Sequence, residues 1–294
     1  MHANDVGTTA DQVRRLVDAQ FPQWADLPIT PVREFGTDHL LYRLGEELLV
    51  RMPRIEDALD QVATDARWLP VLAPRLPVVV PEQLAAGRPG EDYPWGWSVV
   101  RWIPGTAPEP CSVASAAVGR DLGRFVTALR EVDSHGGPVK TGLQRGVPLA
   151  NRDRITRDAV DELGSRVERD AVLAIWQDAV EAPPWSGESV WLHGDLKAGN
   201  LVIDDDRLTG VIDFGALGLG DPAADLTPAW LALQQQARQA FRRAAGLDDA
   251  AWRRGRGWAL SVSLIELPYY WDRSPAIAEG ARRAIAAILA DRGD

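Results

Sequence analysis

The chain has 294 residues and a formal net charge of −10, with 46% hydrophobic and 25% charged residues. These values are ordinary for a soluble globular protein of one large or two ordinary domains, and the acidic balance disfavours a nucleic-acid partner, because the phosphate backbone would be repelled. The single cysteine, Cys111, cannot form an internal disulfide, and neither an apolar signal core nor an apolar run of about 18 residues is present, so we expect a cytoplasmic protein without a membrane partner.

The first hundred residues predict a helix followed by a small antiparallel sheet. Apolar residues at helical spacing predict a helix from Ala10 to Gln20, with Thr9 as its N-cap. Short β-type runs separated by turn residues then predict strands, and a second helix is expected at residues 56–72. The expected strands cover residues 29–35, 39–44, 48–52, 78–80 and 95–103.

The remainder of the chain predicts a mainly helical second domain. Pro104-Gly105 is a turn and linker signal, so we place a boundary between domains 1–103 and 104–294. Ser112 is a candidate N-cap, and residues 134–148 are rich in glycine and polar residues, which favours a loop. The expected helices cover residues 112–132, 151–182 with a break near Gly164, 226–246, 248–267 and 275–290. The fold class is therefore α+β.

Three polar residues stand out between Val190 and Asp225: Asp195, Asn200 and Asp213. Two short apolar runs, 200–203 and 207–212, flank the acidic turn 204–206 and predict a hairpin. A hairpin brings its ends together, so Asn200 and Asp213 can face one cation, and Asp195 precedes them on a loop. Carboxylate and amide oxygens are hard ligands suited to Mg²⁺ held together with nucleotide phosphates.

The motif HGDLKAGN at residues 193–200, followed by IDFG at 212–215, resembles the catalytic loop and the metal-binding loop of the protein-kinase-like fold. The glycine after the histidine, and GDPAAD at 220–225, look like the aminoglycoside phosphotransferase and choline kinase branch. The resemblance implies a two-lobed fold, with a small antiparallel-sheet N-terminal lobe that binds the nucleotide and a mainly helical C-terminal lobe for catalysis and substrate. It also implies ATP or GTP and Mg²⁺ as cofactors.

The resemblance assigns roles within the motif. Asp195 corresponds to the catalytic base, and Lys197 to a cation that faces the transferred phosphoryl group. Asn200 and Asp213 would hold Mg²⁺. We expect His193 to support the loop by packing and hydrogen bonds rather than to act in catalysis.

Asp225 follows Pro222, which can start a helix, and we expect it to buttress the same loop.

The resemblance also assigns nucleotide contacts to the N-terminal lobe. The turn at Gly36 would lie over the phosphates, and the backbone of Arg101 and Ile103 would bind adenine. Arg51 stands where most kinases have a phosphate-binding lysine, and Asp65 stands where they have glutamate. The longer cation and the shorter acid can compensate each other, although Asp65 on a solvated helix face is an alternative.

These features predict a phosphotransferase that phosphorylates a hydroxyl of a small molecule. An aminoglycoside-type antibiotic, and hence antibiotic resistance, follows from the family; a macrolide, a sugar or an amino alcohol are alternatives, as is a catalytically impaired nucleotide-binding or regulatory protein. Residues 221–294 hold 9 acidic against 10 basic residues, with Glu266 among the local acids. Their aromatic residues can line a pocket or form plain core: Trp230, Trp258, Tyr269, Tyr270 and Trp271.

Overall fold

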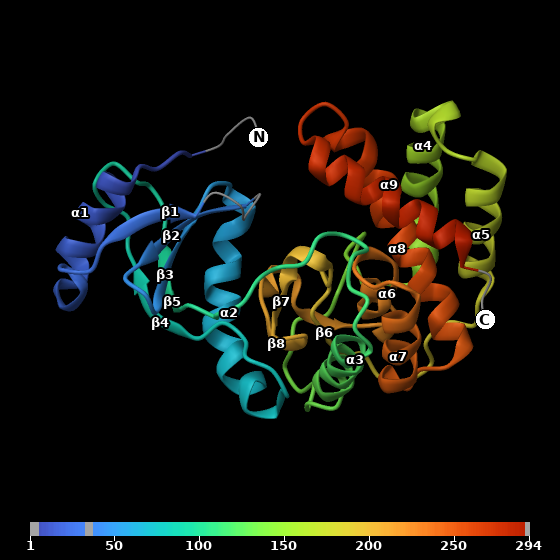
Figure 1. Ribbon diagram of the computed structural model, residues 1–294, viewed down its shortest axis with the longest axis horizontal. Coiled ribbons are helices and arrows are strands. Elements are labelled where there is room, and N and C mark those ends of the chain that lie inside the picture. Colours follow the sequence, from blue (N-terminus) through green and yellow to red (C-terminus); the bar gives the residue numbers. More distant parts are fainter. Residues whose placement is uncertain (1–5, 33–37, 292–294) are drawn as a thin grey trace. The chain divides into compact units, whose positions relative to one another are not determined.

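The computed structural model describes residues 6–32 and 38–291, which form two compact units (Figure 1). The first unit comprises the described residues up to Pro74, together with Val79–Pro104 and Val211–Gly215. The second unit comprises Arg75–Val78, Gly105–Gly210 and the described residues from Ala216 onwards. The main change of unit along the chain falls between Pro104 and Gly105.

An antiparallel sheet of five strands forms the centre of the first unit. The strands are β1 (Ile29–Val32), β2 (His39–Leu44), β3 (Leu48–Pro53), β4 (Gln83–Gly87) and β5 (Trp97–Arg101), and they lie in the order β1-β2-β3-β5-β4. Helix α1 (Ala10–Gln20) precedes the sheet, and helix α2 (Leu59–Leu72) follows a short 3₁₀ turn between β3 and β4. The predicted β1–β2–β3 meander is confirmed.

Helix α1 packs its apolar stripe onto this sheet. Thr9 caps the helix as predicted, because its side chain accepts a hydrogen bond from the Gln12 amide at 3.2 Å. Leu16 is buried in one apolar cluster with Tyr42 of β2 and Trp97 of β5. The helix is therefore held by the burial of one face rather than by its propensity alone.

Two local predictions were wrong, one because of a proline and one because of a side-chain hydrogen bond. Residues 78–80 form no regular strand, since they lie just before Pro81, and the strand begins at Gln83 instead. Ser112 does not cap the following helix, because its hydroxyl donates to the Glu109 carbonyl at 2.7 Å. Ser115 is the cap, with hydrogen bonds of 3.2 and 3.3 Å from the amides of the first turn.

Helices make up most of the second unit. They are α3 (Ala116–Arg130), α4 (Asp153–Leu163), α5 (Arg169–Glu181), α6 (Pro228–Leu231), α7 (Gln235–Ala245), α8 (Asp249–Tyr270) and α9 (Pro275–Ala290). Helix α8 is buried along much of its length and contacts α4, α5 and α9, which lie around it in Figure 1. Helices α3 and α7 approach so closely that a Cβ atom on Gly119 would lie 2.2 Å from the Ala237 carbonyl oxygen. The antiparallel sheet of the first unit and the mainly helical second unit confirm the α+β class.

Two small sheets carry the motif segments. Strand β6 (Val190–Leu192) pairs with β9 (Gly218–Gly220), and β7 (Leu201–Asp204) pairs with β8 (Arg207–Val211). The β7–β8 hairpin confirms the prediction from the acidic turn, where Asp205 and Asp206 adopt positive φ angles of 47° and 58°. Over residues 6–32 and 38–291, no helix combines the length and apolarity needed to cross a membrane.

Candidate active site

The loop after β6 carries most of the motif. Gly194 adopts a φ angle of +80°, and a Cβ atom there would lie 2.3 Å from the Ala216 carbonyl oxygen, so this position requires glycine. His193 is fully buried, and its Nδ1 accepts a hydrogen bond from the Asp195 amide at 3.2 Å. The predicted supporting role of His193 therefore agrees with its position.

Asp225 supports the backbone of the same loop, as predicted. Its two carboxylate oxygens accept hydrogen bonds from the His193 amide at 2.7 Å and from the Gly194 amide at 2.8 Å. Burial raises the pKa of Asp225, while the electrostatic effect of His193 and the two hydrogen bonds from backbone amides lower it. A buried carboxylate with two amide donors fixes the backbone that presents Asp195.

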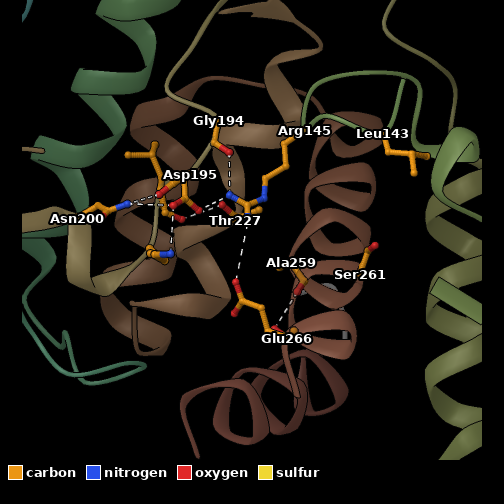
Figure 2. A network of polar contacts seen from close by, with 12 residues as sticks. Leu143, Arg145, Gly194, Asp195, Asn200, Thr227, Ala259, Ser261 and Glu266 are labelled. Carbon is orange, nitrogen blue, oxygen red and sulfur yellow. Dashed lines mark hydrogen bonds and ion pairs between the residues drawn. The ribbon is translucent and has the colours of Figure 1, made fainter. Parts of the chain in front are cut away.

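Three donors surround the Asp195 carboxylate (Figure 2). Lys197 Nζ lies 3.1 Å from Oδ2, and Asn200 Nδ2 donates to Oδ2 at 3.3 Å and to the Asp195 backbone oxygen at 2.8 Å. The third donor is Arg145, whose Nη1 contacts Oδ1. The structure thus brings together Asp195, Lys197 and Asn200, which the motif predicted, with Arg145, which it did not.

These charges decide the protonation of the cluster. Burial alone raises the pKa of Asp195, but the positive charges of Arg145 and Lys197 outweigh it and leave that pKa below the usual range. Burial lowers the pKa of Lys197, but the negative charges of Asp195 and Glu266 reverse this effect and raise it. Asp195 is therefore an ionised carboxylate and Lys197 an ammonium at neutral pH.

Arg145 had no signal in the sequence. It lies 50 residues before Asp195, in the glycine-rich segment 134–148 that was predicted only as a loop. Its Nη1 also donates to the Gly194 carbonyl at 3.1 Å, and its Nη2 lies 3.9 Å from Glu266 Oε1. Glu266, singled out as a local acid, belongs to this cluster, where burial raises its pKa against the lowering effect of Lys197 and Arg145.

Arg51 and Asp65 form a second cluster, within the first unit. Arg51 Nη1 lies 2.7 Å from Asp65 Oδ2, and the two side chains are 9% and 2% exposed. The alternative of Asp65 on a solvated helix face is therefore wrong. The strand cation and the helix carboxylate pair directly, so the longer arginine does meet the shorter aspartate.

The remaining predicted residues are placed as follows. Gly36 lies outside the described residues. The Arg101 amide is already used, because it donates to the Glu82 carbonyl at 3.0 Å, and its guanidinium pairs with the Glu82 side chain. The Ile103 amide donates to no backbone carbonyl within the described ranges. Asp213 follows β8 with a φ angle of +63° in the segment grouped with the first unit, whereas Asn200 belongs to the second.

Known proteins share both this sequence pattern and this fold. An aminoglycoside 3′-phosphotransferase of Escherichia coli is 33% identical over 81 residues, which are 27% of this chain and 30% of that protein. One from Streptomyces fradiae is 32% identical over 152 residues, 48% of this chain and 54% of that protein. The matched region thus spans between about a third and about half of the length of these relatives.

Solved structures match over nearly the whole chain. The GDP and kanamycin complex of APH(2″)-IIia has a TM-score of 0.74 at 19% identity, covering 94% of this chain and 97% of that one. The macrolide 2′-phosphotransferase of Brachybacterium faecium has a TM-score of 0.62 at 24% identity, with coverage of 94% and 97%. At these identities the likeness concerns the fold, and it confirms the two-lobed, protein-kinase-like architecture.

A family profile described as the phosphotransferase enzyme family matches residues 30–258. This range includes Arg51 and Asp65 as well as the whole stretch from His193 to Asp225. Since the match covers well over half of the chain, the chain belongs to the phosphotransferase enzyme family, as its two motifs indicated.

Proposed function

We propose that this protein is a nucleotide- and Mg²⁺-dependent kinase that transfers a phosphoryl group to a hydroxyl of a small molecule. The observation that carries the proposal is the Asp195 carboxylate, which is held ionised by two cations on a loop that Asp225 fixes through its backbone. A carboxylate in this state can accept the proton of an attacking hydroxyl. The single cysteine favours a reducing compartment, so we place the enzyme in the cytoplasm.

The donor set fits a nucleotide and a hard cation. Arg51, pre-oriented by the buried Asp65, offers a guanidinium for phosphate oxygens. Asn200 and Asp213 offer an amide oxygen and a carboxylate, which are ligands that Mg²⁺ accepts. When bound, the ion would supply neutralisation of phosphate charge. We assign adenine or guanine recognition to backbone groups of Arg101 and Ile103; the Ile103 amide is the better donor, because that of Arg101 is already engaged.

The chain's own residues perform the remaining steps. Asp195 accepts the proton of the acceptor hydroxyl at its carboxylate, and Lys197 supplies positive charge where negative charge develops on the phosphoryl oxygens. Asn200 keeps the loop closed through its hydrogen bond to the Asp195 backbone oxygen. Phosphoryl transfer needs positioning and charge neutralisation more than covalent catalysis, and this loop provides both.

An aminoglycoside remains the first candidate for the acceptor, because the matched relatives from Escherichia coli and Streptomyces fradiae are aminoglycoside 3′-phosphotransferases. Beside Glu266, the C-terminal part of α8 borders a cavity of about 470 Å³ in the second unit. Tyr269 and Tyr270 line it, together with Glu162, whereas Trp230 and Trp258 are fully buried core residues. We propose this cavity as part of the acceptor site.

Macrolides, sugars and amino alcohols are the other acceptors to test. A macrolide is supported by the likeness of fold to the Brachybacterium faecium enzyme. The alternative of a catalytically impaired binding protein depended on the unusual Arg51 and Asp65. Their direct ion pair of 2.7 Å favours an active enzyme instead.

The test is a phosphorylation screen with labelled ATP and GTP against aminoglycosides, macrolides, sugars and small alcohols, with Asp195→Asn as the matched control. The proposal expects one acceptor class to be phosphorylated by the wild type, with turnover lowered by about three orders of magnitude or more in the variant. Equal turnover in the variant would reject Asp195 as the base. Nucleotide binding without transfer to any acceptor would instead support the regulatory alternative.

A further inference from the structure

Residues 138–146 form a segment with turns that is tied at its start to strand β9 and at its end to Asp221, the residue after β9. The Leu219 amide donates to the Pro138 carbonyl at 2.7 Å, and the Lys140 amide donates to the Leu219 carbonyl at 2.9 Å. Further along, the Asp221 amide donates to the Gly146 carbonyl at 2.8 Å. Because β9 pairs with β6, which leads into the Asp195 loop, the segment has a fixed position relative to that loop.

The segment also packs closely at Gly146, next to Arg145. A Cβ atom on Gly146 would lie 2.4 Å from Leu192 Cδ1, and one on Gly220 would lie 2.5 Å from the Gly146 carbonyl oxygen. Gly146 has a φ angle of +103°, which residues other than glycine rarely adopt. The backbone that carries Arg145 is therefore held by packing as well as by hydrogen bonds.

The guanidinium of Arg145 donates to two acceptors from this position and lies near the Glu266 carboxylate (Figure 2). Nη1 donates to the Gly194 carbonyl at 3.1 Å and contacts Asp195 Oδ1, and Nη2 lies 3.9 Å from Glu266 Oε1. Its side chain is 25% exposed, and that of Asp195 is 19% exposed. By bridging Gly194 and Asp195, one nitrogen ties the carboxylate to the backbone of its own loop.

The other donors to Asp195 both lie at its Oδ2. Lys197 and Asn200 approach this oxygen at 3.1 and 3.3 Å. The proposed function assigns Lys197 to the transferred phosphoryl group, which can draw it away from Oδ2, whereas Asn200 can bind a metal through its amide oxygen and still donate through Nδ2. Arg145 occupies the opposite oxygen and also donates to the Gly194 carbonyl.

We propose that Arg145 is a positioning residue of the phosphoryl-transfer reaction, which keeps the Asp195 carboxylate oriented while Lys197 and Asn200 serve the nucleotide and the metal. This inference rests on the proposed function. A lysine at position 145 would keep the charge and three N–H donors, but it lacks the fixed, planar arrangement of the guanidinium and would not hold the carboxylate in the same orientation. A positive charge at position 145 is therefore not enough by itself to orient the Asp195 carboxylate.

The kinetic test compares Arg145→Met and Arg145→Lys with a matched control, Arg152→Met. Arg152 donates to the Leu143 carbonyl at 2.6 Å and to the Ser261 hydroxyl at 3.1 Å, so its removal takes contacts away from segment 138–146 and from α8, and neither of these hydrogen bonds involves Asp195. We expect Arg145→Met to lower kcat by about 100-fold, with KM for ATP changed less than about twofold, because misplacement of a reacting group costs about this much in rate. Arg145→Lys should recover part of kcat, and the control should keep kcat within about threefold of the wild type.

Two kinetic outcomes would overturn the inference: unchanged kcat in Arg145→Met, or an equal loss in the Arg152→Met control. If Arg145→Met does not fold, the Arg145→Lys variant decides, since full activity there would exclude the positioning role.

A structural measurement needs no turnover. In a crystal structure of the wild type with Mg²⁺ and a non-hydrolysable ATP analogue, Arg145 should remain within hydrogen-bond distance of Asp195. An Arg145 that has moved entirely to Glu266 would refute the inference while leaving the proposed kinase function intact. Absence of binding of the analogue, checked by calorimetry, would refute the proposed function and the inference together.

Discussion

Acidification should destabilise the fold through His39, the first residue of β2. Its side chain is 6% exposed, and among the described residues its Nε2 has no hydrogen-bond partner. Burial, aided by the positive charge of Arg51, lowers the pKa of His39 from 6.5 to about 3. The folded protein therefore keeps this imidazole neutral where the unfolded chain protonates it.

The sign and the magnitude follow from this difference. Between pH 6.5 and about 3, the unfolded chain binds a proton at His39 that the folded chain does not. The free energy of unfolding therefore falls as the pH falls, by about 1.4 kcal/mol per pH unit. Acidification from about pH 7.5 to about pH 4.5 should remove roughly 3 kcal/mol through His39 alone, a large share of the ~5–15 kcal/mol that is typical of a folded domain.

Urea unfolding followed by tryptophan fluorescence measures this effect. Each pH should be examined for the wild type, for His39→Leu and for His135→Leu, which removes an exposed imidazole and serves as the matched control. The difference in unfolding free energy between the wild type and His39→Leu should shift by roughly 3 kcal/mol in favour of the variant over this pH range. Equal losses of unfolding free energy in the wild type and in His39→Leu over this pH range would refute the reasoning.

Three further predictions concern the candidate site. Arg51→Lys and Asp65→Glu should each lower kcat/KM for ATP by about tenfold. The double variant should recover activity, because the longer glutamate returns the reach that the shorter lysine loses. Strictly additive effects in this double-mutant cycle would remove the pair from nucleotide binding. Asp213→Asn should weaken ATP binding with Mg²⁺ more than without it in calorimetry, whereas equal losses would mean that Asp213 is not a ligand. Gly194→Ala should lower the melting temperature and turnover together, because the added Cβ atom would lie 2.3 Å from the Ala216 carbonyl oxygen. An unchanged melting temperature would contradict this close packing.

Local patterns in the sequence predicted much of the fold. The Thr9 cap, the meander from β1 to β3 and the β7–β8 hairpin each depend on residues close together in the chain, so spacing and turn chemistry were enough to find them. The same holds for the loop from His193 to Asn200. Errors arose where neighbouring residues offered two solutions, as at Ser112 and Ser115, between which the side-chain contacts of the folded chain decide.

The Arg51–Asp65 pair marks the limit of this approach. The motif comparison identified both positions, but the sequence left open whether Asp65 faces solvent. Whether two side chains meet depends on how α2 packs against the sheet, which local spacing does not determine. Only the 2.7 Å contact and the burial of both side chains establish the pair.

Arg145 differs from these cases, because nothing in its own neighbourhood distinguishes it from a surface arginine in a loop. The backbone of the Asp195 loop is fixed by nearby motif residues and by Asp225, whereas the carboxylate also depends on a segment 50 residues earlier, which reaches the loop through its bonds to β9. Under the proposed function, a homologue that retains every motif residue would still lose this orientation of the carboxylate if its counterpart of segment 138–146 differed. The motif residues account for the backbone support of Asp195, whereas the partner of its second carboxylate oxygen is found only in three dimensions.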